Sequence, residues 1–493
     1  MRAQRERDEP GPADPAPAGL AGRLAGLRVC VNGLGVSGPP VARALAARGA
    51  VVTAVGGRDN EANRLLAGEL AGRGVAVELS QVPRLPPGTG LVVTTPGWKP
   101  GTPLLAEAEA AGIPVIGDVE LAWQLRPAAQ DWLAVTGTNG KTTTVRMLAA
   151  MLAAAGHRTI AAGNVGLPVI EAVTDAEPYH VLAVELSSFQ LHWSSSLRPF
   201  AAVVLNVAAH HLDWHGDMDS YARAKGRIFA PGTIAVCNAE DARSAGLAAA
   251  APGTARVVAF RLGAPGPGEL GVAGGVLLDR AFGDQAGRAG VPLAGIGEVR
   301  PQVPHNVADA LAAAALARAY GAPPAAVSAG LAAFQPEPHR MSLVATAGGV
   351  AYVDDSKASN PHAAAAALAS YPSVVWIAGG LFRGSGADID ALVRANRPRL
   401  RGVVLLGADR EVIRRSLARH APDVPVEEAD GTDTGVMDLV VAEAARLAVP
   451  GDTVLLAPAA QSFDMFRDYP ARGEAFAAAV RRLAGRGPQR EAR

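Results

Sequence analysis

Short runs of aliphatic and β-branched residues recur along the chain, and glycine, proline or polar residues bound each run. The runs cover residues 29–31, 51–55, 91–95, 115–116, 132–135, 181–184, 201–205, 374–378, 403–406 and 454–457. Stretches with helical periodicity lie between them; in one, Val145, Leu148 and Leu152 share a face. Short apolar strands that alternate with helices are typical of βαβ units. The pattern therefore predicts an α/β fold with mainly parallel sheets.

The runs fall into three groups, which predict three domains. We predict three α/β domains, an N-terminal one over residues 27–118, a central one over 119–337 and a C-terminal one over 338–493. Residues 1–26 mix charge with Pro, Ala and Gly without periodicity, which predicts a disordered tail. Residues 261–300 are Gly-rich and weakly patterned, which predicts an irregular or antiparallel part of the central domain.

Composition excludes several classes of protein. The 493 residues carry 46 Lys+Arg and 46 Asp+Glu, so no bulk positive field favours nucleic acid. Two cysteines, Cys30 and Cys237, argue against a disulfide framework or a cysteine-held metal. No apolar run reaches the roughly 18 residues of a membrane span, and the N-terminus lacks the apolar core of a signal peptide. We expect a cytoplasmic protein with neither nucleic acid nor membrane as partner.

Lysine is rare in this chain. Four of the 46 cationic residues are lysines, namely Lys99, Lys141, Lys225 and Lys357. Arginine has evidently taken almost every position that needs only a cation, and the two side chains are not interchangeable where a compact charge or an amine is required. The four lysines are therefore candidates for such work.

The strongest candidate site is the sequence GTNGKTTT at residues 137–144, between a predicted strand and a predicted helix. Backbone N–H groups of a Gly-rich turn and the N-terminus of a helix bind phosphate, Lys141 would reach the terminal phosphates, and the Thr142 hydroxyl would bind Mg²⁺. A strict P-loop has glycine where Val135 stands, so this is a compressed variant. The alternative is a Gly-rich turn with an incidental lysine.

Three further groups could take part in the same chemistry. Glu185 ends a buried strand, where a carboxylate suits Mg²⁺, although an ordinary strand-end acid would look the same. His210, His211, Asp213 and His215 could hold zinc, assist a second Mg²⁺ or a substrate carboxylate, or form a surface loop. Lys225 could form a carbamate with CO₂ and so become a metal-binding anion, or it is a solvated helix lysine.

Loops at strand ends elsewhere suggest ligand contacts. Residues 33–38 fit G-x-G-x-x-G and favour a phosphate-bearing ligand, but no acidic residue ends the next strand as a dinucleotide site would require. The loops at 353–360, 379–384 and 458–464 are polar or Gly-rich where an open sheet places ligands, and ordinary βα connections are the alternative.

With these pieces in order, the chain from about residue 27 to its end resembles the Mur ligase family. The resemblance rests on GTNGKTTT at 137–144, GNVG at 163–166, ELSSFQL at 185–191, NVAAHHLD at 206–213, YARAKGRIF at 221–229, HN at 305–306, PHR at 338–340, DDSKASN at 354–360 and APAAQSFDMFRDYPARG at 457–473. Within the family, ELSSFQL and DDSKASN are most similar to the member that adds D-glutamate.

The resemblance implies an activity and its partners. The expected enzyme is an ATP-dependent ligase that adds D-glutamate to UDP-N-acetylmuramoyl-L-alanine through an acyl phosphate and releases ADP and phosphate, in cytoplasmic peptidoglycan precursor synthesis. It implies ATP, two Mg²⁺ ions and a carbamate on Lys225 as cofactors, small-molecule substrates as partners, and a monomer. The resemblance also implies the kind of each domain. A Rossmann-like N-terminal domain would bind the UDP-substrate, a central P-loop ATPase-like domain with a mainly parallel sheet would bind ATP, and a Rossmann-like C-terminal domain would bind the amino acid and the nucleotide.

The family's site residues map onto positions of this sequence. The resemblance implies Lys141, His211 and Lys225 as catalytic residues. It implies ATP contacts from Gly137, Thr138, Asn139, Gly140, Lys141, Thr142, Thr143, Asn306, Arg340, Asp355 and Lys357. Metal ligands would be Thr142, Glu185, His211 and Lys225. The UDP-substrate would meet Val36, Ser37, Thr95, Pro96, Gly97 and Asn164, and D-glutamate would meet Ser359, Arg383, Ser462, Phe463 and Tyr469.

Two positions depart from the family pattern. The acidic residue often found after the second strand of the first domain is absent, and Gly56-Gly57 stand there. A lysine seen in some members in the glycine-rich loop of the last domain has no counterpart, so Arg383 is the nearest cation and could hold a carboxylate through two hydrogen bonds.

Three rival functions are open at this point. One is another amide ligase of the same family that adds a different amino acid or lengthens folate tails. Another is an NAD-dependent oxidoreductase that uses the loop at 33–38. The third is a non-catalytic nucleotide-binding scaffold or an amidotransferase subunit, but the latter usually carries a four-cysteine zinc insert that two cysteines cannot supply.

Overall fold

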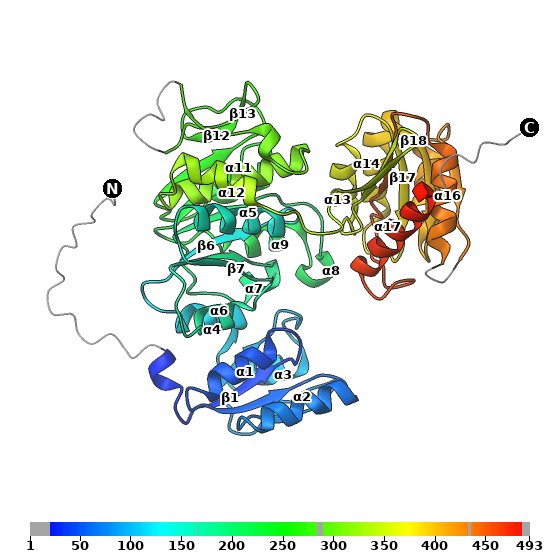
Figure 1. The fold of residues 1–493 in the computed structure, drawn as a ribbon. Helices are drawn as coiled ribbons and strands as arrows, with labels where there is room; N and C mark the ends of the chain where they lie inside the picture. Colours follow the sequence, from blue (N-terminus) through cyan, green and yellow to red (C-terminus); the bar gives the residue numbers. More distant parts are fainter. Residues whose placement is uncertain (1–19, 165, 283–288, 432–434, 486–493) are drawn as a thin grey trace, which may run out of the picture.

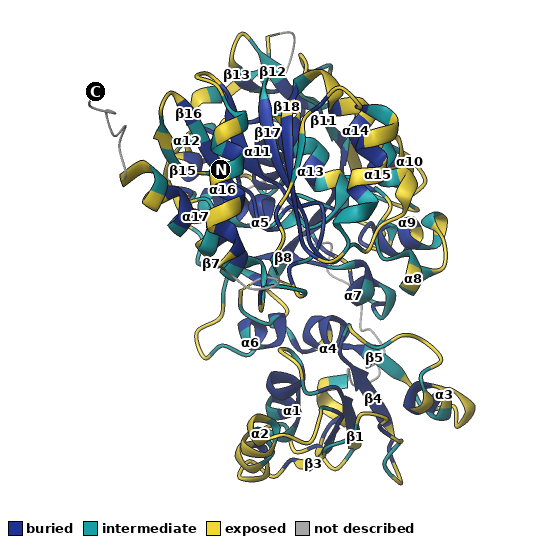
Figure 2. Ribbon diagram, turned by 90° about the vertical axis from the view of Figure 1, so that its right-hand side faces the viewer, coloured by how far each residue is buried: buried dark blue, intermediate teal, exposed yellow. Residues whose placement is uncertain are grey.

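The computed structural model describes residues 20–164, 166–282, 289–431 and 435–485. Three β-sheets, each flanked by helices, follow one another along the chain (Figure 1). The central strands of these sheets are buried and the outer helix faces are exposed (Figure 2). The predicted α/β class with mainly parallel sheets is confirmed. Among the described residues no helix is long and apolar enough to cross a membrane.

The first sheet is wholly parallel, with strand order β3-β2-β1-β4-β5. Its strands are β1 (Arg28–Asn32), β2 (Val51–Val55), β3 (Ala76–Glu78), β4 (Leu91–Thr94) and β5 (Val115–Gly117). The helices are η1 (Leu20–Arg23), α1 (Gly38–Ala46), α2 (Glu61–Ala71), α3 (Pro103–Ala110) and α4 (Asp118–Leu125). The strand order reverses between β1 and β4, and open sheets bind ligands at such a point.

The second sheet has nine strands in the order β14-β13-β12-β11-β10-β9-β6-β8-β7. They are β6 (Asp131–Thr136), β7 (Thr159–Gly163), β8 (Val181–Glu185), β9 (Ala201–Val204), β10 (Ile234–Asn238), β11 (Arg256–Phe260), β12 (Glu269–Ala273), β13 (Val276–Asp279) and β14 (Val291–Gly295). Pairing is parallel from β7 to β12 and antiparallel from β12 to β14. The antiparallel strands lie in the Gly-rich stretch at 261–300.

Within residues 131–164, 166–282 and 289–333, nine helical segments accompany the second sheet. They are α5 (Lys141–Ala154), α6 (Val169–Val173), α7 (Ser188–His192), α8 (Leu212–His215), α9 (Met218–Gly226), α10 (Ala242–Ala249), η2 (Ile296–Glu298), α11 (Pro304–Ala319) and α12 (Pro324–Ala333). Small residues let three of them approach closely: a Cβ at Gly330 of α12 would come within 2.5 Å of Met151 Cα in α5. The run of buried alanines in α11 completes this core, which packs α5 between the sheet and the helices α11 and α12.

The third sheet has the order β15-β16-β20-β17-β18-β19 and is parallel except for the β15–β16 pair. Its strands are β15 (Ser342–Ala347), β16 (Val350–Asp354), β17 (Val374–Gly379), β18 (Leu400–Leu406), β19 (Val426–Glu428) and β20 (Thr453–Leu456). The helices are α13 (Pro361–Leu368), α14 (Gly386–Asn396), η3 (Arg397–Arg399), α15 (Arg410–His420), α16 (Val436–Leu447) and α17 (Tyr469–Gly485).

The predicted tail at residues 1–26 is too long. Residues 1–19 lie outside the described part, but η1 follows directly and Leu24 is fully buried in the first hydrophobic core. Leu24 packs this segment against the first domain, and η1 contacts α4. One buried leucine among Gly and Ala residues makes no periodic pattern, so the sequence did not indicate that the segment is ordered.

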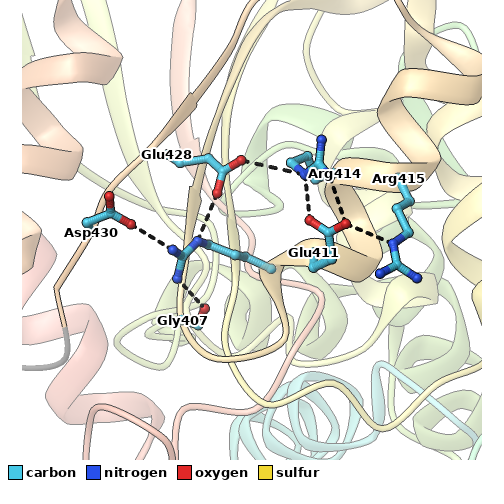
Figure 3. Close-up of polar contacts among 7 residues, drawn as sticks. Gly407, Glu411, Arg414, Arg415, Glu428 and Asp430 are labelled. Carbon is cyan, nitrogen blue, oxygen red and sulfur yellow. Dashed lines mark hydrogen bonds and ion pairs between the residues drawn. The ribbon is translucent and has the colours of Figure 1, made fainter.

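Ion pairs cover the outside of the third domain. On α15, Glu411 accepts hydrogen bonds from Arg414 and Arg415, and Arg410 pairs with Glu428 and Asp430 (Figure 3). Exposed pairs of this kind add little to stability because solvent and salt screen them. The network therefore marks a solvated face.

Candidate active site

The loop between β6 and α5 has the geometry of an anion-binding turn. Gly140 is left-handed, with φ of 86°, and a Cβ there would lie 2.2 Å from Asp309 Oδ1, so only glycine fits. Asn206 fixes the loop from the next strand end, because its Oδ1 accepts from the N–H groups of Thr138 (3.1 Å) and Asn139 (2.9 Å). The loop is therefore preorganised at the N-terminus of a buried helix.

Lys141 is the first residue of α5 and folds back over this loop. Its Nζ donates to the carbonyls of Gly137 (3.0 Å) and Thr138 (2.9 Å). Desolvation lowers the pKa of its amine. The carboxylate of Glu185 acts in the opposite direction, and the positive charges of Arg340 and Lys357 lower the pKa further. Several cations thus converge on one place, which suits a multiply charged anion.

Glu185 and Thr142 meet beside the loop. Thr142 Oγ1 donates to Glu185 Oε2 at 2.8 Å, and Asn164 Nδ2 donates to Oε1 at 2.9 Å. Glu185 ends β8 and is 2% exposed. A hydroxyl and a carboxylate in contact at the rim of a phosphate site are hard oxygen donors of the kind that Mg²⁺ takes together with phosphate oxygens and water. The residues present therefore fit one such ion.

The histidine loop lies close to Lys141. His210 lines the central cavity, whereas His211 is left-handed (φ 56°) and packs against Phe189, with ring centroids 4.7 Å apart. Burial lowers the pKa of His210 to about 3 and that of His211 to about 4, with the nearby lysines adding to it. Both imidazoles are neutral at neutral pH, the form that binds a metal. In the described ranges no three or more His, Cys, Asp or Glu side chains gather closely enough to hold an ion alone.

Lys225 is a buried amine on α9. Its side chain is 1% exposed, its Nζ donates to Gly137 O at 2.8 Å, and it lies 4.6 Å from the centre of the Tyr221 ring. Desolvation holds its pKa well below the ordinary value, and repulsion from Lys141 adds to this. The interpretation of Lys225 as a solvated helix lysine is therefore wrong. A neutral amine is also the form that can react with CO₂.

The third domain reaches the same loop. Asn360 Nδ2 donates to Asn139 Oδ1 at 3.3 Å, and His362 Nδ1 lies 2.8 Å from Asn139 Nδ2. One cavity of about 660 Å³ runs between the second and third domains and takes lining residues from both. Burial raises the pKa of Asp355 and of Asp309 to about 7 in its wall.

Most of the predicted nucleotide and metal residues line this cavity. They are Thr138, Asn139, Gly140, Lys141, Thr142, Thr143, Glu185, Asn306, Arg340, Asp355 and Lys357. Asn164, predicted to contact the UDP-substrate, and Ser359 and Tyr469, predicted to contact D-glutamate, line it too. Gly137, His211 and Lys225 do not line it. The carbonyl oxygen of Gly137 nevertheless accepts hydrogen bonds from the amines of both Lys141 and Lys225. Sequence reasoning missed the roles of Asn206 and Asp309. Asn206 directly follows a buried strand and is the kind of strand-end polar residue that could have been singled out.

The predicted UDP-substrate residues other than Asn164 lie apart, in the first domain. They occupy the loops after β1 and β4, on either side of the point where the strand order reverses. Thr95 Oγ1 donates to Asn32 O at 3.1 Å, and a Cβ at Gly33 would lie 2.2 Å from that Oγ1, so the two loops are in contact. Val36 is 84% exposed at this place, which is unusual for an aliphatic side chain.

The predicted D-glutamate residues are divided. Ser359 and Tyr469 line the central cavity, whereas Ser462 is buried and Arg383 and Phe463 are exposed outside it. Arg472 of α17, which sequence reasoning did not single out, joins the two loops that carry these residues. Its guanidinium donates to Ser356 Oγ (3.0 Å), Ser356 O (2.8 Å) and Ala460 O (3.1 Å).

Known protein families and relatives match this sequence over most of its length. The profile described as Mur ligase middle domain matches residues 135–317, and the profile described as Mur ligase, glutamate ligase domain matches residues 339–460. A UDP-N-acetylmuramoylalanine–D-glutamate ligase of Thermobifida fusca is 59% identical over 465 residues, covering 94% of this chain and 100% of that protein. The protein of that name from Mycolicibacterium smegmatis is 49% identical, covering 94% of this chain and 99% of its own.

Solved structures show the same fold at lower identity. A pseudomurein peptide ligase type C from Methanothermus fervidus superposes with a TM-score of 0.58 at 15% identity, covering 93% of this chain and 100% of its own. The UDP-N-acetylmuramate-alanine ligase of Thermotoga maritima superposes with a TM-score of 0.53 at 19% identity, covering 93% and 100%. With the two profile matches and the full-length relatives, these findings show that the chain belongs to the Mur ligase family of ATP-dependent ligases.

Proposed function

We propose that this enzyme joins D-glutamate to the alanine carboxyl group of UDP-N-acetylmuramoyl-L-alanine at the expense of ATP, in the synthesis of peptidoglycan precursors. The observation that carries the proposal is the shared cavity, in which the anion-binding loop and Lys141 face Arg340 and Lys357 of the third domain. The relatives that match along their whole length carry the name of this activity. The rival oxidoreductase function lacks support, because Gly56 and Gly57 stand where its acidic residue is needed.

The reaction needs an activated carboxyl group, because a carboxylate is a poor electrophile. The alanine carboxylate attacks the γ-phosphorus of ATP, the bond to ADP breaks, and an acyl phosphate forms. The amine of D-glutamate then attacks the acyl carbon, phosphate leaves, and the amine loses a proton. Lys141 and the N–H groups at the start of α5 stabilise the charge that builds up on the transferred phosphoryl group.

Magnesium would be held at two places. Thr142 and Glu185 would bind one ion after giving up their mutual hydrogen bond, and His211 with a carbamate on Lys225 would bind the other. When bound, the ions neutralise phosphate charge and polarise the phosphoryl oxygen. The low pKa of His211 suits a neutral ligand and makes it a weak acceptor for the amine proton.

Replacing Lys225 with alanine tests the carbamate. The Lys225→Ala enzyme is expected to lose at least about 100-fold in kcat, because an anionic ligand near the reacting phosphate disappears. Acetate or formate should restore part of the rate by supplying a carboxylate to the vacated space, measured as phosphate release against carboxylate concentration. Rescue by methylamine and not by acetate would show that the amine itself acts.

The remaining residues divide by substrate. The uridine nucleotide would bind at the first domain through Val36, Ser37, Thr95, Pro96 and Gly97, with Asn164 near its pyrophosphate. D-glutamate would bind at the third domain through Ser359, Arg383, Ser462, Phe463 and Tyr469. We likewise propose the division at residues 27–118, 119–337 and 338–493, with closure of the third domain bringing Lys357 over the nucleotide.

A screen of phosphate release tests the function directly. The purified chain receives ATP, Mg²⁺, UDP-N-acetylmuramoyl-L-alanine and one amino acid at a time. D-glutamate should give release and a product heavier by one glutamyl residue in mass spectrometry, whereas L-glutamate, L-alanine and diaminopimelate should give background. Turnover with another amino acid, or with a folate in place of the UDP-substrate, would replace this proposal with a different ligase activity.

A further inference from the structure

Glu337 lies in the linker between α12 and β15, where the second domain passes into the third. Its carboxylate meets three cations: Oε2 lies 2.9 Å from Lys357 Nζ and 3.0 Å from Arg340 Nε, and Oε1 lies 3.4 Å from Arg146 on α5. The cations come from both sides of the domain boundary, since Arg146 belongs to the helix that carries Lys141. Glu337 therefore joins the two domains at the rim of the cavity.

The contacts hold Glu337 in its charged form. Its side chain is 18% exposed, and burial alone would favour the neutral acid. Lys357 and Arg340 outweigh burial and keep the pKa below its ordinary value. Screening by solvent is weaker at such a position than on the surface network of α15, so the pairing restrains the cations more strongly.

The restrained cations point toward the cavity. Arg340 and Lys357 both line it, and both repel Lys141 across it. Without a counter-ion, these charges would drive the third domain away from the loop whenever no phosphate is bound. Glu337 offsets that repulsion from outside the cavity and leaves the cavity itself open to an anion.

We propose that Glu337 is a positioning residue for the nucleotide, which holds Lys357 and Arg340 at the cavity rim and ties them through Arg146 to the helix bearing Lys141. The proposal rests on the nucleotide role given above to Lys357 and Arg340. Long cationic side chains lose conformational freedom when they bind a phosphate, and a side chain that is already held loses less. Glu337 thus acts on affinity for ATP more than on the chemical step.

The first test is Glu337→Gln, which keeps the shape and removes the charge. We expect KM for ATP to rise about tenfold, the equivalent of one or two side chains that must be ordered on binding, while kcat stays within about threefold. A purely structural role would lower the melting temperature and kcat together and leave KM unchanged. Glu337→Asp keeps the negative charge on a side chain that is one methylene shorter, and it should recover part of the affinity for ATP.

A double-mutant cycle separates this inference from the proposed function. If Lys357→Ala alone leaves KM for ATP unchanged, the nucleotide role of Lys357 is wrong. If Lys357→Ala raises KM but Glu337→Gln does not, the nucleotide role stands and the positioning role fails. The positioning role requires the effect of Glu337→Gln to shrink by at least about threefold in the Lys357→Ala background, since residues in one network are not additive. Fully additive effects would overturn it.

Two control variants remove carboxylates with comparable ion pairs elsewhere. Glu269→Gln removes a β12 carboxylate whose side chain is 19% exposed and breaks its pair with Arg261. Glu411→Gln breaks the pairs with two arginines on α15 (Figure 3). Both should leave KM for ATP within about twofold. Should Glu337→Gln not fold, Arg146→Gln removes the tie to α5 at a half-exposed site, and an unchanged KM for ATP in that variant would count against the proposal.

Discussion

Replacing Lys141 with alanine is expected to lower the rate of ATP-dependent ligation by roughly 10³-fold or more while the chain stays folded. The amine of Lys141 lies at the start of α5, and two loop carbonyls now hold it where the terminal phosphates of ATP would come. Nothing else on α5 can reach that point as a compact cation. Charge that develops on the transferred phosphoryl group would therefore lose its main counter-ion.

The rate is measured as phosphate release with saturating D-glutamate and UDP-substrate. Lys141→Arg is informative beside it, because guanidinium is planar and broader than ammonium and should also be poor at this crowded site. The matched control is Lys99→Arg, a substitution of an exposed lysine whose Nζ donates to Asp213 O in α8, and it should stay within about twofold of the unmodified enzyme. Near-normal turnover by Lys141→Ala would remove the loop from the mechanism and leave the shared cavity unexplained.

The parallel strands could be predicted because they are buried on both faces. Runs such as 181–184, 374–378 and 454–457 are apolar at every position, and the structure places β8, β17 and β20 there with all of these residues buried. The edge strands β3 and β19 have three residues each, are partly exposed and carry glutamate, so no run marks them. Strand pairing and order follow from packing between distant segments, which a local pattern does not contain.

The loop between β6 and α5 could be predicted because, unlike the strand order, it is formed by residues that are close together in the sequence. Glycines, Lys141 and Thr142 follow one strand and begin one helix, so their geometry is set within a few residues. The adjacent histidines show the limit of this approach. Sequence spacing does not tell His210 from His211. In the structure His210 lines the cavity, whereas His211 has a left-handed backbone and packs against Phe189.

Residues that act across long sequence separations escaped prediction. Asp309 approaches Gly140 from α11, and Glu337 collects cations from α5 and the third domain. Arg472 is the strongest case: it is 1% exposed and binds loops more than 100 residues apart in sequence, yet it is one arginine among dozens. Composition made the rare lysines stand out and concealed Arg472, which is the one fully buried arginine within the part of the chain that the structure describes.

Replacing Arg472 with methionine is expected to destabilise the third domain by about 3 kcal/mol or more and to weaken D-glutamate binding. The substitution keeps most of the volume but removes three hydrogen bonds, and it leaves the buried carbonyls of Ser356 and Ala460 without their donor. Burial lowers the pKa of Arg472 to about 10, so it stays charged at neutral pH and its hydrogen bonds are of the stronger, charge-assisted kind.

For a domain of roughly 150 residues, a loss of this size lowers Tm by about 6–12 °C, which calorimetry of the full chain measures. Hydrogen exchange should rise in the segments after β16 and β20, because Arg472 is their common support. Below the new Tm, KM for D-glutamate should rise severalfold more than KM for ATP, since Ser359 and Ser462 lie on those loops.

Arg482→Met is the matched control on α17: the loss of its exposed pair with Asp438 should lower the free energy of unfolding by at most about 1 kcal/mol. A Tm shift no larger than that of Arg482→Met would show that the two loops hold their places without Arg472, and equal changes in both KM values would show that it does not serve the amino-acid pocket.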